Sequence, residues 1–389
     1  MVERASQHDG KTQLPALTGV RALAALMVLA LHAGQNFSQF FTDNTFVQHG
    51  YLGVDLFFVL SGFIIAHVYL SELVPARGKA LRVFLWHRFV RLFPTHATVL
   101  LILMALVIAM RSFGIALNEP QNWSYRDLPW HFLMVHAWGT VDVAGWNAPS
   151  WSISAEWFAY LLFPAIAAGT LALPRRAALP LAFATLLIAA VIFNVEQWTI
   201  EWAWLGPPAL LRVTSEFICG VLLYRATRID STGLSPRRSD LLAFGGLMGL
   251  CTGAFLAVND FVLIGFLAVL ITGVSGPGAG VRIVFGCRPV VWLGEISYST
   301  YLVHFPVLLI LRHGADHIAA ARIVASEMMR LMMFVVSIGF VIGAAALLFY
   351  LVEYPTRTRL RNLLGKIDSQ PLRPDAMATR NDARIKATH

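Results

Sequence analysis

The chain has 389 residues, of which 57% are hydrophobic and only 13% are charged, whereas soluble domains carry about 25% charged residues. Its apolar residues come in repeated blocks about twenty residues long, which excludes an ordinary soluble enzyme and indicates a polytopic membrane protein. The net charge of +8 is explained by basic loops on the cytoplasmic side of such a protein, so no nucleic-acid partner is expected.

Helices are the expected elements because a lipid-exposed segment must satisfy its own backbone hydrogen bonds, and the alternating ten-residue strands of a membrane barrel are absent. The ten candidate spans are residues 16–34, 50–70, 92–112, 149–169, 178–195, 207–225, 240–257, 260–275, 290–311 and 330–352. Arg and Lys concentrate in alternate loops, which predicts that both termini are cytoplasmic. The fold class predicted is therefore all-α, with about ten transmembrane helices in one bundle.

This bundle is expected over residues 15–356, between a polar cytoplasmic leader at 1–14 and a cytoplasmic tail at 357–389. The tail is polar, charged and poor in aromatic residues, so it is expected to be disordered. The location predicted is the inner membrane of a bacterium, with several passes and with membrane lipid as a neighbour.

The first span carries Arg21 and His32, and polar side chains in such a segment are costly and therefore indicate function. Eleven residues correspond to about three helical turns and about 16 Å along the axis, so both residues lie on one face. His32 is a candidate general base because the unperturbed pKa of histidine is about 6.5. The alternative is a helix-end histidine at the outer interface.

The second span contains the stretch GYLGVDLFFVLSGF, in which Gly53 and Gly62 permit close approach between helices. Asp55 lies among apolar residues and requires a partner. A catalytic or substrate-binding role for Asp55 and a structural ion pair or hydrogen bond both remain open.

Arg88 and Arg91 share one helix face at the inner end of the third span. Their forked guanidinium groups suit phosphates, although an anchor on lipid phosphates has the same pattern. The loop from 113 to 148 then brings four tryptophans and two histidines. It is interpreted either as an interfacial aromatic belt or as a lid with stacking surfaces for a sugar.

Ser152 and Glu156 are four residues apart on one face of the fourth span. Glu156 could accept a proton, orient His32 or bind a hydroxyl, and a structural bond to another helix is the alternative. Arg212 and Glu216 have the same spacing and are expected to form a buried structural pair.

The ninth span contains Tyr301 and His304, with Pro306 expected to kink the helix beside them. His304 is either a packing histidine or a site residue. The histidines and carboxylates singled out so far come from different spans and lack the spacing of metal ligands, so no metal is expected.

Together these motifs resemble the acyltransferase-3 family of integral membrane acyltransferases. The resemblance spans residues 14–356 and rests on LTGVRALAALMVLALHAG, GYLGVDLFFVLSGFII, RFVRLFP, SWSISAEW, YSTYLVHFP and VEYP. It implies transfer of an acyl group, often acetyl from acetyl-CoA, to a hydroxyl of a sugar, glycan or glycolipid. It also implies that His32 is the catalytic histidine, that Arg21 is a partner on the donor path, and that Arg88 and Arg91 bind the donor.

The chemistry of the donor agrees with these roles. Coenzyme A is polyanionic at its nucleotide end, and its pantetheine arm has a reach of the order of the 16 Å estimated between Arg21 and His32. Glu156 or Asp55 is expected to orient the catalytic imidazole. The acyl-CoA is a co-substrate, and no tightly bound cofactor is expected.

Ser152, Tyr301 and His304 are the residues expected to contact the acceptor. The alternative function is a transporter or flippase of a glycan or lipid, which also uses intramembrane charge but predicts inverted repeats and broken half-helices. Neither feature is evident. A non-catalytic scaffold, the third possibility, leaves the aligned Arg21 and His32 without a purpose.

Overall fold

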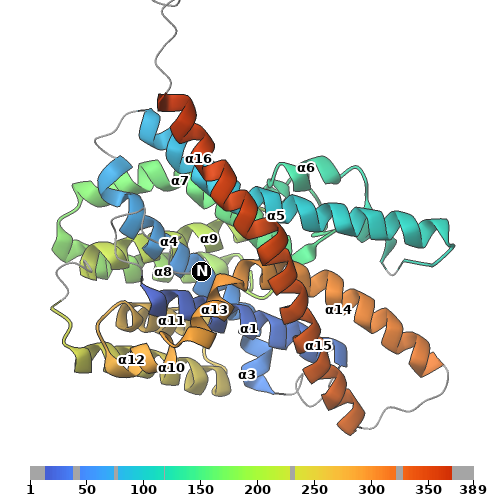
Figure 1. Ribbon diagram of the computed structural model, residues 1–389. Coiled ribbons are helices and arrows are strands. Elements are labelled where there is room, and N and C mark those ends of the chain that lie inside the picture. The colour runs from blue at the N-terminus through green and yellow to red at the C-terminus, as the bar shows by residue number, and fades with distance from the viewer. Residues whose placement is uncertain are drawn as a thin grey trace, which may run out of the picture.

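The protein is an assembly of helices joined by turns and loops (Figure 1). The computed structural model describes residues 14–37, 44–73, 78–117, 119–227, 233–320 and 327–369. Within these ranges no residue lies in a β-strand, so the predicted all-α class is confirmed. The leader up to residue 13 and residues 370–389 lie outside the described ranges.

All but the last of the long helices follow the predicted apolar blocks. They are α1 (Pro15–Phe37), α4 (Leu52–Leu73), α5 (Lys79–Ser112), α7 (Trp151–Ala172), α8 (Arg175–Val195), α9 (Gly206–Thr227), α10 (Pro236–Phe255), α11 (Asp260–Val274), α14 (Ser297–Ala320), α15 (Glu327–Leu348) and α16 (Tyr354–Ser369). The short ones are α3 (Thr45–Gln48), α6 (Leu128–Phe132), α12 (Ala279–Val284) and α13 (Arg288–Glu295).

By helix length and hydropathy, the structure has fewer candidate membrane crossings than the ten predicted from the sequence. Within the described ranges, seven helical stretches are long and apolar enough to cross a membrane, or eight if α13 and α14 form one bent span. The helix α11 is apolar but shorter, and α10 is not among the candidates. A multi-pass membrane protein is thus supported, whereas the count of ten is not confirmed.

The central helix α1 packs against α4, α13, α14 and α15. Glycines make the closest contacts around α4. A Cβ atom added at Gly53 would lie 2.3 Å from the carbonyl oxygen of Ala24 in α1, and one added at Gly62 would lie 2.1 Å from that of Phe217 in α9. Both distances are far below van der Waals contact, which confirms that these glycines allow the helices to pack closely.

The ninth predicted span is bent, but Pro306 does not produce the main bend. The break of 64° lies between α13 and α14, and Pro306 lies inside α14. Next to the break Gly294 packs closely on α1, because an added Cβ would lie 1.8 Å from the carbonyl oxygen of Thr18. The Ser297 hydroxyl donates to the Gly294 carbonyl at 2.7 Å and satisfies this acceptor at the break.

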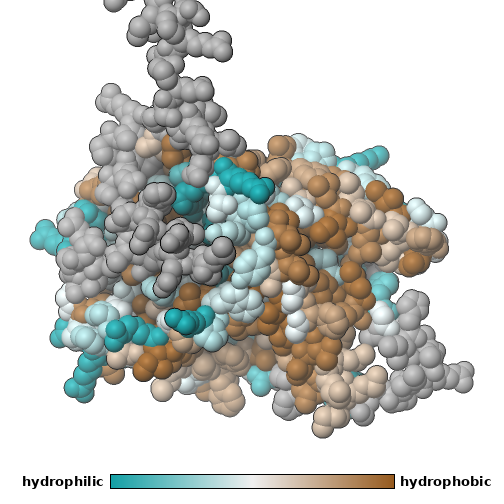
Figure 2. All heavy atoms as spheres, in the orientation of Figure 1, coloured by the Kyte–Doolittle hydropathy of each residue, from teal (hydrophilic) through white to brown (hydrophobic). Residues whose placement is uncertain are grey.

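The C-terminal segment differs from the disordered tail that was expected from residue 357. A π-helical turn, Phe349–Glu353, connects α15 to α16, so the chain is helical up to Ser369. The indole nitrogen of Trp86 in α5 donates to the carbonyl oxygen of Leu360 at 2.9 Å and holds α16 against α5. In Figure 2 the surface over α15 is largely hydrophobic.

The loop from 113 to 148 is folded rather than open. It contains α6 and three 3₁₀ turns, Pro120–Trp123, His136–Trp138 and, at its end, Ala148–Ser150. Trp123 and Trp146 are buried and pack edge to face with their ring centroids 5.8 Å apart. Of the four tryptophans, only Trp130 is exposed, so most of these rings fill the interior of the loop and are not free to stack on a sugar.

Candidate active site

An arginine-lined cavity of about 310 Å³ lies between α1, α4, α5, α7, α14 and α16. Its arginines are Arg21 from α1, Arg88 and Arg91 from α5, and Arg357 and Arg361 from α16. Glu156 is the one carboxylate among the lining residues. Five guanidinium groups facing one carboxylate give the cavity a strong excess of positive charge, which attracts a polyanion.

Aromatic rings hold the two arginines of α5. The guanidinium carbon of Arg88 lies 5.4 Å from the ring centroid of Tyr69 and 5.8 Å from that of Tyr160, and that of Arg91 lies 6.0 Å from the Tyr298 ring. Such cation–π contacts orient a guanidinium without neutralising it. Neither arginine forms an ion pair in the described part of the chain, so their charge remains available to a ligand.

Glu156 is fixed on the cavity wall by two hydroxyl groups. Its Oε1 atom accepts hydrogen bonds from Ser61 of α4 at 2.7 Å and from Tyr160, one turn along α7, at 2.5 Å. The structure does not bring Glu156 to His32, which was expected from the sequence. Glu156 lies on the wall of the arginine-lined cavity instead.

His32 and His304 form a pair, with their ring centroids 5.0 Å apart. The Nδ1 atom of His32 lies 2.9 Å from the Val28 carbonyl oxygen, and that of His304 lies 2.6 Å from the Tyr301 carbonyl oxygen. A carbonyl oxygen only accepts, so each Nδ1 carries a proton and each Nε2 retains a basic lone pair. The buried Nε2 of His304 has no partner in the described structure.

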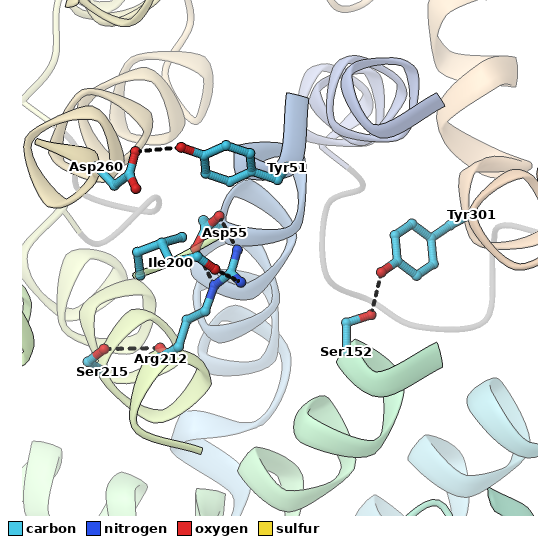
Figure 3. A network of polar contacts seen from close by, with 8 residues as sticks. All are labelled: Tyr51, Asp55, Ser152, Ile200, Arg212, Ser215, Asp260 and Tyr301. Carbon is cyan, nitrogen blue, oxygen red and sulfur yellow. Dashed lines mark hydrogen bonds and ion pairs between the residues drawn. The ribbon is translucent and has the colours of Figure 1, made fainter. Parts of the chain in front are cut away.

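Tyr301 separates this pair from the cavity. Its ring lines the cavity and lies 5.7 Å, centroid to centroid, from the His304 ring. Its hydroxyl accepts a hydrogen bond from Ser152 at 2.8 Å (Figure 3) and donates one to the Pro149 carbonyl at 2.8 Å. Ser152 and Tyr301, which line the cavity, and His304, which lies behind Tyr301, therefore form a connected group, as the sequence predicted.

Asp55 lies elsewhere, in a buried ion pair with Arg212 of α9 (Figure 3). The two side chains share two hydrogen bonds of 2.8 and 2.7 Å, and Arg212 also donates to the Ile200 carbonyl at 2.8 Å. Asp55 does not line the cavity and does not contact His32. The geometry favours the structural alternative for this residue over a catalytic one.

The expected pairing of Arg212 with Glu216 is wrong. Arg212 pairs with Asp55, and neither carboxylate oxygen of the buried Glu216 has a hydrogen-bond partner in the described structure. Within the same ranges, no group of three or more His, Cys, Asp or Glu side chains could hold a metal ion.

Several lining residues escaped the sequence reasoning. Arg357 and Arg361 fall within the cytoplasmic tail that was expected at 357–389, although their spacing of four residues was a signal for one helical face. Ser61 and Tyr298 lie within the quoted motifs but were given no role. Tyr160 stands four residues after Glu156, a spacing that could have indicated their hydrogen bond.

Comparison with known proteins shows what the sequence of this chain is similar to. A family model described as an acyltransferase domain matches residues 14–350. The chain is 29% identical over 336 residues to Acyltransferase MdmB of Streptomyces mycarofaciens, a match that covers 78% of this chain and 80% of the relative.

Two further relatives are longer proteins. The chain is 25% identical over 333 residues to peptidoglycan O-acetyltransferase OatA of Listeria monocytogenes and 26% identical over 335 residues to putative peptidoglycan O-acetyltransferase YrhL of Bacillus subtilis. These matches cover 79% and 76% of this chain but 51% and 49% of the relatives, so the chain spans about half their length. No solved structure matches the chain.

Proposed function

The chain belongs to the acyltransferase-3 family of membrane acyltransferases, and on this premise we propose that it transfers an acyl group from cytoplasmic acyl-CoA to a hydroxyl group of a sugar, glycan or glycolipid. The observation that carries the proposal is the cavity with its excess of arginine, which has Tyr301 on its wall and the His32–His304 pair beside that ring. Acetyl is the acyl group proposed, because the relatives include proteins named as O-acetyltransferases.

Coenzyme A fits the charge of the cavity. Its diphosphate and 3′-phosphate are anionic, and guanidinium groups bind such groups through paired hydrogen bonds. Arg21, Arg88 and Arg91 are proposed to hold this end of the donor. The uncharged pantetheine arm then extends along the cavity toward Tyr301, and the thioester lies at that end.

The proposed reaction uses His32 as the general base. Its Nε2 atom takes the proton of the acceptor hydroxyl, and the hydroxyl oxygen attacks the thioester carbonyl carbon as the proton leaves. The carbon–sulfur bond then breaks, and the departing thiolate receives the proton from the imidazolium. The hydrogen bond that the Nδ1 atom of His32 donates to the Val28 carbonyl oxygen fixes the tautomer and the orientation of the ring, as a carboxylate does in a catalytic triad.

The proposed orientation places both termini and the arginines at the cytoplasmic side, with His32 and His304 toward the outside. The bias of basic residues toward alternate loops supports it. The cavity would then receive its donor from the cytoplasm, and the acceptor would approach the histidines from the other face of a bacterial inner membrane.

The proposal predicts that His32→Ala abolishes transfer. We expect a loss of about 10²- to 10⁴-fold in the rate, with expression and thermal unfolding in detergent unchanged. The measurement is the transfer of radiolabelled acetyl from acetyl-CoA to glycan in membrane vesicles.

A matched control is His49→Ala, because His49 is also half-buried. Its Nδ1 atom likewise donates a hydrogen bond to the carbonyl oxygen four residues earlier, that of Thr45, at 2.7 Å. This variant is expected to retain activity. Undiminished transfer by His32→Ala would overturn the mechanism, and a wild-type protein that neither binds nor consumes acetyl-CoA would overturn the assignment of the donor.

A further inference from the structure

The C-terminal helix α16 contributes two arginines to the cavity from beyond the matched family region, which ends at residue 350. Glu353, Arg357 and Arg361 follow one another at intervals of four residues, so they lie on one face. Arg357 and Arg361 line the cavity, whereas Arg359 is exposed and is not among the lining residues. The basic residues of this helix therefore divide into a cavity face and a solvent face.

The cavity face is graded in depth. Glu353 is buried, Arg357 is half-buried and Arg361 is exposed overall while still lining the cavity. The four residues from Arg357 to Arg361 correspond to about 6 Å along the helix. This face of α16 therefore carries positive charge from the half-buried Arg357 out to the exposed Arg361.

Two nearby carboxylates in the described part of the chain are each held by hydroxyl groups through one oxygen. Glu353 accepts a hydrogen bond of 2.7 Å from the hydroxyl of Ser299 in α14, and Glu156 is held by Ser61 and Tyr160. Arg357 forms no ion pair in the described part of the chain. A half-buried guanidinium without a carboxylate partner, in a cavity that is lined by four further arginines, requires an anion from outside the protein.

From this arrangement, and resting on the function proposed above, we infer that α16 recognises the phosphates at the nucleotide end of the donor. Arg357 binds the diphosphate and Arg361 binds the 3′-phosphate on the ribose. The order follows from the depth of the residues, because the thioester points to Tyr301 and the phosphate most remote from it reaches the outermost arginine. The pair thereby selects intact coenzyme A thioesters over shorter pantetheine thioesters.

Three donors test the assignment, with the full-length protein in a non-ionic detergent: acetyl-CoA, acetyl-dephospho-CoA, which lacks the 3′-phosphate, and S-acetylpantetheine, which lacks all phosphates. Arg361→Gln is expected to raise KM for acetyl-CoA about tenfold or more and to leave KM for acetyl-dephospho-CoA unchanged. Arg357→Gln is expected to raise KM for both nucleotide donors and to leave S-acetylpantetheine unaffected. In both variants kcat for acetyl-CoA stays within about twofold, since the arginines do not touch the reacting atoms.

Arg359→Gln is the matched control, because it removes the same charge from the solvent face of the same helix. It is expected to change none of the three KM values. Equal changes in KM for all three donors, or the same changes in Arg359→Gln, would overturn the inference and indicate an unspecific effect of surface charge. Thermal unfolding of each variant, and partial recovery of KM in Arg357→Lys, separate loss of phosphate binding from loss of fold.

A lipid phosphate is the other source of the same chemistry, and liposomes distinguish the two. If KM for acetyl-CoA is unchanged in the variants while the stabilisation of the protein by phosphatidylglycerol over phosphatidylcholine is lost, the arginines bind lipid and the inference fails. Calorimetry with coenzyme A distinguishes a failure of the inference about α16 from a failure of the proposed function. A wild-type protein that does not bind coenzyme A overturns both proposals, whereas equal binding by wild type and Arg357→Gln overturns this one alone.

Discussion

The carboxylate of Asp55 contacts Arg212 through both of its oxygens, and neither side chain is more than 1% exposed. Burying two charges is costly, and their attraction offsets the cost only when the geometry is good and the remaining donors are satisfied. Both conditions hold, because Arg212 also donates to the Ile200 carbonyl and lies over the Trp151 ring at 5.1 Å. The pair thus joins α4, α9 and the start of α7 behind the cavity.

Removing one member of this pair should destabilise the fold more than removing both. Asp55→Leu leaves Arg212 buried and uncompensated, and we expect a loss of about 3–5 kcal/mol in the free energy of unfolding. The double variant Asp55→Leu/Arg212→Met leaves no unpaired charge and should recover much of this loss. Thermal unfolding in detergent measures the difference. A double variant that is as stable as wild type but inactive would show that Asp55 acts in catalysis.

The cavity arginines and the Asp55–Arg212 pair show how far single residues can be predicted from the sequence. Arg21, Arg88 and Arg91 were chosen for their charge, and all three line the cavity. Partners were harder to predict, because Asp55 and Arg212 are separated by 157 positions. Local spacing favoured Glu216 as the partner of Arg212, and no rule for neighbours on one helix can detect a better partner on another helix.

At the scale of elements, the folded loop between α5 and α7 contains a cluster of buried histidines. The rings of His131 and His136 stack with centroids 4.1 Å apart, and His96 of α5 donates from Nε2 to the His131 carbonyl oxygen at 2.9 Å. Neither ring nitrogen of His131 has a partner in the described structure. Burial, together with the nearby His96, lowers the pKa of His131 to about 3, and burial also holds the pKa of His136 well below its usual value.

This cluster predicts that acid loosens the loop. A histidine whose pKa is lower in the folded state stabilises the fold above its unfolded pKa of about 6.5, and this stability is lost as pH falls toward the folded pKa. For His131 the loss between pH 6.5 and pH 5 is about 2 kcal/mol. Thermal unfolding at pH 5 to 8 should therefore show a falling midpoint at low pH.

The variant His131→Gln tests the source of this dependence. It removes the titrating group, so the slope of stability against pH below 6.5 should become shallower. A slope that is the same in wild type and in His131→Gln would contradict the assignment, because the stability lost in acid would then come from other groups.

The ends of elements were less predictable than their existence. Each predicted span coincides with a helix or, at 290–311, with the bent pair α13 and α14, but α5 begins at Lys79 instead of near residue 92. Hydropathy assigns a stretch with Arg88 and Arg91 to a loop, because it treats arginine as solvated. Inside the bundle these two side chains lie over tyrosine rings, so the helix continues through them. The cavity depends on this continuation, since it presents both guanidinium groups on one wall.

At the scale of the whole molecule, the open question is the membrane crossing of α10 and α11. Without them the chain has at most eight candidate spans, and with them it has ten. The two helices are joined by the short connection 256–259, so they add two crossings or none. Either number leaves the start of α1 and the end of α16 on the same side, as the proposed cytoplasmic donor cavity requires.

Cysteine labelling can decide between the two arrangements, after the native Cys219, Cys251 and Cys287 have been replaced by alanine. The new cysteine in Leu256→Cys lies at the exposed α10–α11 connection. We expect a membrane-impermeant maleimide to label it from outside intact cells, because α11 packs beside α4 and α9, which are candidate spans. The cysteine in Arg359→Cys should be labelled only after the membrane is opened.

The length of α11 is the physical argument against this expectation. Its 15 residues extend about 22 Å, whereas the hydrocarbon core is about 30 Å thick. The helix can therefore cross only where the bilayer is thinned or where it is surrounded by longer helices, and α4, α8 and α9 contact it on the protein side. Protection of the Leu256→Cys thiol in intact cells would show that the hairpin returns to the cytoplasm without crossing and that the bundle has eight spans. External labelling of Arg359→Cys would place the arginine cavity outside and exclude a cytoplasmic donor.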